Sequence, residues 1–390
     1  MSRSPNAYDR ADDPRAVPRN DALVQHALDT ISDTDDLLDA ISKARGWPSI
    51  NLDLRNILEA YLNGTTSLTE TADTLCAPIE KAYSSADQGY AFWEAESTAR
   101  ALRPLCSPSE IDHYWGPPVA TCEPDPARAA PQNHLEGRLW GLYVAIIHVS
   151  RRLDWSSESS RLSTVVRLLQ TLQQRRSPPE PDNATLALRT NRVCKPGRLW
   201  ADLSMLGASV AESYNSEHPG GMMGFTEPEV RAWENANAFL ARLTAEGICD
   251  FMAYGVWAMW EVLEGGIANS KQATLTEEAK RGRIDVGLRI VVVWVCVAGQ
   301  EMYARVLRRE RNETRGVGAV VKDSTETKWT DELFLARWRS WKDRLAELVR
   351  YDHNEHEGMK NNAARASQQM VRVEASYKEA TRSSDQNEME

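Results

Sequence analysis

The chain has 390 residues, and 42% of them are apolar, which is typical of a globular protein with a sizeable core rather than of a disordered chain. Its formal net charge is −10, and the basic residues are not gathered in one block, which argues against nucleic acid or an anionic membrane as the main partner. The longest apolar run, 290–299, is far shorter than the ~20 residues that a membrane-spanning helix needs.

Residues 1–20 contain three prolines and no apolar run of the kind that a signal peptide carries. The six cysteines are scattered, without the short spacings of a disulfide framework or a zinc site. We therefore expect a reducing compartment, the cytosol or the nucleus.

Apolar residues in the first half recur at the three- and four-residue spacing of amphipathic helices. We expect a tail over 1–20 that is disordered, followed by helices and two proline-rich connections. Helices are expected over 21–43 in two pieces, over 51–63, 90–102 and 157–175, and from caps at Ser67 and Asn133 onward. The helix that starts at Ser67 should break or kink at Pro78. The proline-rich connections lie over 104–131 and 177–198.

The second half opens with a helix predicted over Leu199–Tyr214. Thr226 and Glu229 have the spacing of a capping box, which places a helix start there. The next helix, Ile248–Glu264, follows Gly247 and is apolar on every side, so we expect the rest of the chain to bury it.

Residues 284–307 are rich in β-branched valine and isoleucine, so a buried strand is possible on propensity alone. We predict a helix, because the segment is too long for a strand and no second strand is near to pair with it. Two further helices are expected, over 331–350 and from a cap at Asn354 onward.

These elements predict an all-α protein, a bundle of about ten to twelve helices around a buried central helix over 248–264. We divide it into a disordered tail (1–20), an N-terminal helical subdomain (21–176), a proline-rich loop (177–198), a C-terminal helical subdomain (199–380) and a second disordered tail (381–390).

The second half contains an ordered set of short motifs. The set comprises Leu199-Trp200-Ala201-Asp202-Leu203, residues 237–243, Trp257 with Glu261, Trp294 with Ala298-Gly299, and Arg337-Trp338 with Trp341-Lys342. Together they resemble a family of filamentous-fungal proteins known as a domain of unknown function, over roughly 199–370 and more faintly at 57–64. The resemblance implies a soluble helical protein, and it implies no catalytic residue, since the family carries no established activity.

Three short patterns suggest chemistry, each beside a simpler interpretation. Asp35, Asp36 and Asp39 match the DDxxD pattern with which class I terpene synthases bind Mg²⁺, but an acidic solvated helix face explains them better. His353, His356 and Glu357 are read as a solvated helix start rather than a metal site. The glycine-rich run 219–224 follows no strand, so it is a loop and not a phosphate cradle.

Four charged residues lie on otherwise apolar segments, namely Arg242, Asp250, Glu261 and Arg289. A buried charge needs a partner, so structural ion pairs, in particular Glu261 with Arg242 or Arg289, are the simpler interpretation. The alternative is that they form the polar floor of a pocket whose walls are Trp200, Trp257, Trp260 and Trp294.

No complete catalytic constellation is present, so we predict a protein that acts by binding, either to a protein partner or to a small apolar ligand, without a metal ion or cofactor. The alternative is an enzyme with a dispersed site, of which a terpene-synthase-like Mg²⁺-dependent lyase is the best named version. The oligomeric state cannot be read from the pattern.

Overall fold

A computed structural model describes residues 16–48, 51–84, 135–157, 161–179, 194–195, 197–217, 225–265, 277–314, 333–350 and 357–387. Several predicted features lie outside these residues. They are most of the N-terminal tail, the helix over 90–102, the connection over 104–131, the cap at Asn133, the glycine-rich run, and the segment with His353, Asn354 and His356.

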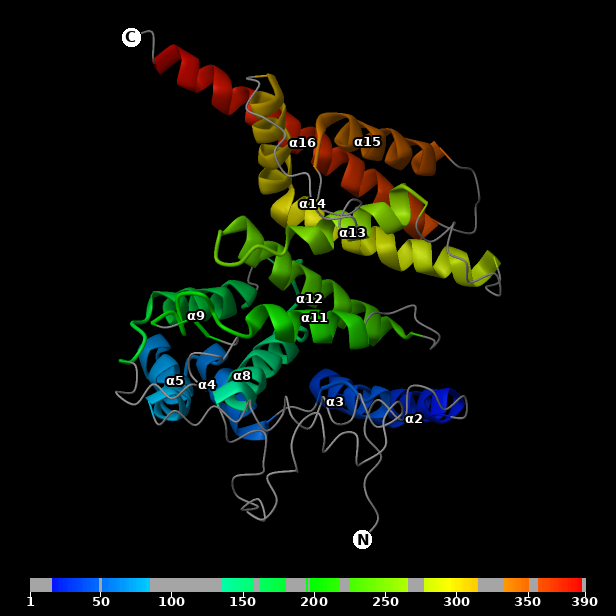
Figure 1. Ribbon diagram of the computed structural model, residues 1–390. Coiled ribbons are helices and arrows are strands. Elements are labelled where there is room, and N and C mark those ends of the chain that lie inside the picture. Colours follow the sequence, from blue (N-terminus) through cyan, green and yellow to red (C-terminus); the bar gives the residue numbers. More distant parts are fainter. Residues whose placement is uncertain are drawn as a thin grey trace, which may run out of the picture. The chain divides into compact units, whose positions relative to one another are not determined.

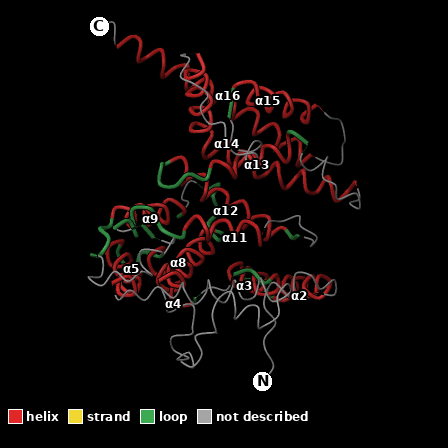
Figure 2. The backbone as a smooth tube through the Cα atoms, viewed as in Figure 1, coloured by secondary structure: helices red, strands yellow, loops and turns green. Residues whose placement is uncertain are grey.

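Twelve helices and no strand make up the regular structure of the described residues, which confirms the all-α class (Figure 2). Within this part of the chain, no helix combines the length and the apolar character that crossing a bilayer requires. By contacts the chain divides into two units that alternate along the sequence. Unit 1 comprises 1–41, 151–162 and 218–390, and unit 2 comprises 42–150 and 163–217. The sequential subdomains 21–176 and 199–380 stay a prediction.

Unit 2 contains α4 (Leu52–Leu62), α5 (Leu68–Ser84), α8 (Leu135–Ser150), α9 (Leu162–Gln174) and α11 (Leu206–Glu217) (Figure 1). Helix α8 is its core element: it packs against α4, α5 and α11, and its last nine residues are all buried. Its even distribution of apolar residues around the axis explains this position, because a helix without a polar face needs neighbours on several sides.

Two local features of unit 2 differ from the alternatives that the sequence allowed. Helix α5 runs through Pro78 to Ser84, so a break there is excluded, while a kink at Pro78 stays a prediction. The helix predicted from Leu199 begins seven residues later, at Leu206, because residues 199–205 form turns. In these turns Leu203 and Met205 have φ angles of +43° and +75°, and a right-handed helix cannot continue through such residues.

Unit 1 contains α2 (Ala16–Thr30), α3 (Thr34–Arg45, of which residues up to Ile41 belong to this unit), α12 (Glu227–Ala245), α13 (Met252–Leu263), α14 (Glu277–Thr314), α15 (Leu335–Arg350) and α16 (Glu357–Asn387). Helix α12 starts at the predicted capping box, where the Thr226 N–H donates to the Glu229 carboxylate at 2.7 Å.

The 38-residue helix α14 is the element on which unit 1 is built (Figure 1). It packs against α12, α13, α15 and α16, and Ile290–Val295 are all buried. The choice of helix over strand for 284–307 is therefore confirmed. Burial on several sides accounts for the β-branched run, because a helix surrounded by neighbours needs no polar face.

The expected central helix, α13, is shorter than predicted and is not buried on every side. It begins at Met252 rather than Ile248, and one of its sides is partly exposed: Ala253, Trp257, Trp260 and Glu264 lie there. Its buried side rests on α14, where Gly255 allows the indole of Trp294 to approach closely. The central position in unit 1 therefore belongs to α14.

Helix α15 is joined to its neighbours by two fully buried tryptophans. The Trp341 indole N–H donates to Glu264 at 2.6 Å, and Arg337 holds the same carboxylate at 2.6 Å. The Trp338 indole N–H donates to Glu374 of α16 at 2.9 Å, and Lys342 holds that carboxylate at 2.7 and 2.8 Å. These contacts connect α15 to the end of α13 and to α16.

Candidate functional site

A cavity of about 420 Å³ lies in unit 1, at the start of α13 and beside the C-terminal half of α14. Its volume falls within the range of about 300–1,000 Å³ that small-molecule sites occupy. The lining residues come from the α12–α13 connection, α13, α14 and the segment before α15: Asp250, Met252, Ala253, Arg305, Arg309 and Leu333.

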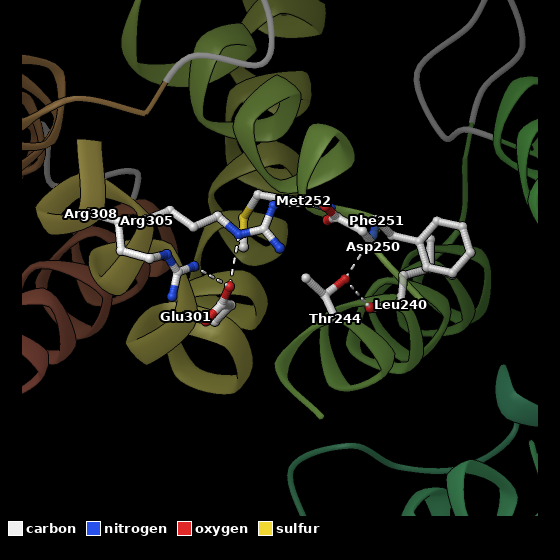
Figure 3. A network of polar contacts seen from close by, with 8 residues as sticks. All are labelled: Leu240, Thr244, Asp250, Phe251, Met252, Glu301, Arg305 and Arg308. Atoms are coloured by element: carbon white, nitrogen blue, oxygen red, sulfur yellow. Dashed lines mark hydrogen bonds and ion pairs between the residues drawn. The ribbon is translucent and has the colours of Figure 1, made fainter. Parts of the chain in front are cut away.

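Short-range hydrogen bonds shape the connection that carries Asp250 (Figure 3). The Thr244 hydroxyl donates to the Leu240 carbonyl at 2.9 Å and accepts the Phe251 N–H at 3.0 Å. Asp250 accepts the Met252 N–H at 3.0 Å through Oδ1, which satisfies one of the N–H groups that a helix start leaves without an intrahelical partner. The sequence between Leu240 and Met252 therefore fixes the edge of the cavity by itself.

Arg305 joins this edge to α14. Its Nη1 donates to Asp250 Oδ2 at 2.8 Å, and its Nε donates to Glu301 Oε1 at 2.9 Å (Figure 3). Glu301 also accepts from Arg308 Nη2 at 2.8 Å. The Asp250 side chain is 62% exposed and that of Arg305 is 29% exposed, so the pair lies at the solvent-facing edge of the cavity.

The pair keeps both groups ionised. Burial raises the pKa of Asp250, but the hydrogen bonds from Arg305 and from the Met252 N–H outweigh burial and lower it. Burial lowers the pKa of Arg305, and the hydrogen bonds to Asp250 and Glu301 raise it by more. Partial exposure keeps the contribution of such a pair to stability small.

The rest of the lining combines a second guanidinium with apolar groups. The Arg309 guanidinium lies over the Phe334 ring, 5.7 Å from its centroid, which restricts its orientation. Met252 and Leu333 are buried, and Ala253 is exposed on the first turn of α13. The cavity thus presents cationic groups and hydrocarbon surface side by side, as sites for amphipathic small molecules do.

The predicted site residues are distributed over several environments. Asp250 lines the cavity. Arg242 is half-buried on α12. Arg289 of α14 binds two carboxylates of α12, Glu227 at 2.7 and 2.9 Å and Glu234. Glu261 is half-buried on the partly exposed side of α13, so it is not the fully buried carboxylate that the predicted Glu261–Arg pair requires.

The four predicted tryptophans lie in different environments. Trp200 is buried in unit 2, where its indole N–H donates to Glu80 at 3.0 Å, and Arg175 holds the same carboxylate at 2.6 Å. Trp294 is buried against α13 and donates to Asn237 Oδ1 at 3.0 Å. Trp257 and Trp260 are half-buried on α13. Trp200 and Trp294 thus have a structural role.

Sequence reasoning missed five lining residues, Met252, Ala253, Arg305, Arg309 and Leu333. One signal was available. Arg305 and Arg309 are one helical turn apart, at the point where the apolar run of α14 ends. Such a pair is also the ordinary composition of a helix approaching its C-terminus, so it does not identify a site without the position of Asp250.

Two of the three DDxxD aspartates, all on α3, form ion pairs. Asp35 and Asp39 both form ion pairs with Arg152, whose guanidinium neutralises the charge that a Mg²⁺ ion would need. Across the described segments, no three His, Cys, Asp or Glu side chains converge as metal ligands would. The arrangement gives no support to the terpene-synthase alternative.

Comparison with known proteins gives one match. The family described as "Protein of unknown function (DUF3632)" matches residues 143–345, which is more than half of the chain. No curated protein and no solved structure matches the chain. The matched region runs from α8 to α15 and contains Asp250, Arg305 and Arg309. The chain therefore belongs to the DUF3632 family of proteins of unknown function.

Proposed function

We propose that the protein is a ligand-binding protein and that the cavity at the start of α13 is its binding site. The observation that carries the proposal is the lining itself, in which buried Met252 and Leu333 offer apolar contact beside charged groups that fix orientation. The ligand is a small molecule with an apolar part.

Binding rather than catalysis is supported by the chemistry of the lining. Asp250 and Arg305 neutralise each other, and arginine remains protonated, so neither is tuned as a general acid or base near neutral pH. The described cysteines Cys76, Cys194, Cys249 and Cys296 are free thiols, which agrees with a reducing cytosolic or nuclear compartment.

Native mass spectrometry of the protein purified from its own host tests the proposal. A retained small molecule is expected on the wild-type protein. The variant Ala253→Trp should lose it, because an indole at this exposed lining position fills the mouth of the cavity without disturbing the core.

The matched control is Ala375→Trp, at an exposed alanine of α16 that does not line the cavity. This variant should keep the wild-type adduct. Equal retention of the adduct by both variants would place the ligand elsewhere and overturn the proposal.

A further inference from the structure

The proposed binding function can be refined by the chemistry of Arg305. We infer that the ligand is an amphipathic carboxylate whose anionic group is bound by the Nη edge of Arg305, with its hydrocarbon part against Met252, Ala253 and Leu333. This inference rests on the proposed function, because it assigns the ligand class of the same cavity.

The guanidinium of Arg305 has hydrogen-bonding capacity to spare. Arginine has five N–H donors, and the structure uses two of them, Nε to Glu301 and Nη1 to Asp250. Within the described residues, Nη2 makes no hydrogen bond. A carboxylate that accepts from both Nη atoms forms the bidentate geometry for which a guanidinium is suited.

Arg305 is already held in place. Glu301 binds its Nε at 2.9 Å from one helical turn earlier on α14, so the guanidinium plane is fixed without the help of a ligand. A donor group that is fixed before binding loses less rotamer entropy on binding. Glu301 is thus a positioning residue for the anion.

Asp250 is the present partner of Nη1. Its side chain is 62% exposed, so it can release Nη1 and turn to solvent without being desolvated. Its bond to the Met252 N–H involves the other carboxylate oxygen. Asp250 therefore acts as an exchangeable anion that competes with the ligand for Arg305.

The charge of the lining favours an anion. It contains two guanidinium groups, on Arg305 and Arg309, and one carboxylate, on Asp250. A cationic ligand would meet two like charges there, whereas a carboxylate meets favourable partners once Asp250 turns away.

The test compares three probes of equal chain length by isothermal titration calorimetry: octanoate, 1-octanol and octylammonium. Octanoate should bind about ten- to a hundredfold more tightly than 1-octanol, as hydrogen bonds to a charged group allow. Octylammonium should bind more weakly than 1-octanol.

Two variants should change the octanoate affinity in opposite directions. Arg305→Gln should remove the preference for octanoate and leave 1-octanol binding as it is. Asp250→Asn should strengthen octanoate binding several-fold, because the competing anion is removed while the amide oxygen can still accept the Met252 N–H.

Arg308→Gln is the matched control, since Arg308 also binds Glu301 but does not line the cavity. It should keep the wild-type preference. Glu301→Gln should reduce the ratio of octanoate to 1-octanol affinity, a quantity that a merely structural role would not change.

The outcomes separate the two proposals. Equal affinity for octanoate and 1-octanol, or a preference that survives Arg305→Gln, would overturn the carboxylate inference while leaving a binding site for apolar molecules. Absence of binding by all three probes would overturn the binding function of the cavity and the inference with it.

Discussion

The buried tryptophans Trp200, Trp338 and Trp341 share one local arrangement. Each donates its indole N–H to a glutamate that a neighbouring arginine or lysine also holds. The glutamates are Glu80, Glu374 and Glu264. A buried indole N–H is costly without an acceptor, and a partly buried carboxylate is costly without a cation, so each trio satisfies both groups.

Trp341→Phe tests the importance of such a trio. The variant removes the donor to Glu264 and leaves a small gap, so the free energy of unfolding should fall by about 1.5–3 kcal/mol, as for a lost hydrogen bond to a charged group. Urea denaturation provides the measurement. The control is Trp260→Phe, at a half-buried position of α13, which should lower the free energy of unfolding by less than about 1 kcal/mol. Equal losses of stability in the two variants would show that the hydrogen bond of Trp341 to Glu264 does not stabilise the protein.

Glu374 makes the stability of unit 1 depend on acid pH. Burial raises its pKa, but hydrogen bonds from Lys342 and Trp338 lower it by more. Because the folded-state pKa is lower than the unfolded value of about 4.3, the stabilisation is fully present above that value and is lost as the pH falls through the folded-state pKa.

The variant Glu374→Gln should therefore be less stable than the wild type at pH 7. Its urea midpoint should fall less steeply than that of the wild type between pH 5 and pH 3, a range that begins near the unfolded-state pKa of about 4.3 and extends below it. Lys342→Met should lose part of the same pH dependence. If the urea midpoints of the wild type and of Glu374→Gln fall in parallel with pH, Glu374 is not a source of the pH dependence of stability.

At the scale of the elements, local signals were predictable and pairings were not. The spacing of residues within one segment is enough to predict the capping box at Thr226 and Glu229 and the long helix over 284–307. The cavity depends on Asp250 meeting Arg305, which lies 55 residues away in the sequence. Periodicity gives the face of a helix but not the neighbour, which explains why α13 rather than α14 was expected at the centre.

The contact between α13 and α14 depends on the absence of a side chain at Gly255. A Cβ atom there would lie 2.6 Å from Trp294 Cε3 and 2.7 Å from Cδ2, and this indole is fully buried. Gly255→Ala should therefore lower the free energy of unfolding by about 1–3 kcal/mol, the usual cost of overpacking a core. Thermal unfolding followed by circular dichroism would measure it.

Gly282→Ala is the matched control on α14, because the nearest atom to the new Cβ would be Phe225 Cζ at an ordinary 3.8 Å. The free energy of unfolding of this variant should rise by about 0.5–1 kcal/mol, because alanine has less backbone freedom than glycine in the unfolded chain. A stabilising Gly255→Ala would contradict the close approach of the two helices.

For the whole molecule, the region that the family model matches is not a complete structural unit. Residues 143–345 include the second half of α8 and all of α9, α11, α12, α13 and α14, but they omit α4 and α5 of unit 2 and α16 of unit 1. Helix α16 contacts both α14 and α15 and carries Glu374. The family boundary therefore leaves part of each core uncovered.

A fragment of residues 143–345 should accordingly show reduced helicity and aggregate, because Trp338 and the α16 side of α14 would meet water. Circular dichroism and size-exclusion chromatography would measure this. The matched control is a longer fragment, residues 1–379, which keeps the buried residues of α16 up to Val373 and should behave as the full chain does. A monomeric, fully helical 143–345 fragment would refute the argument.

The alternation of the two units along the chain also has a consequence for synthesis on the ribosome. Helices α2 and most of α3 belong to unit 1, yet the principal helices of that unit, α12 to α16, begin only after residue 218. At about 5–20 residues per second, roughly ten to forty seconds of translation separate them. Throughout this interval α2 and most of α3 have been synthesised without the other helices of their unit, while the helices of unit 2 are being made.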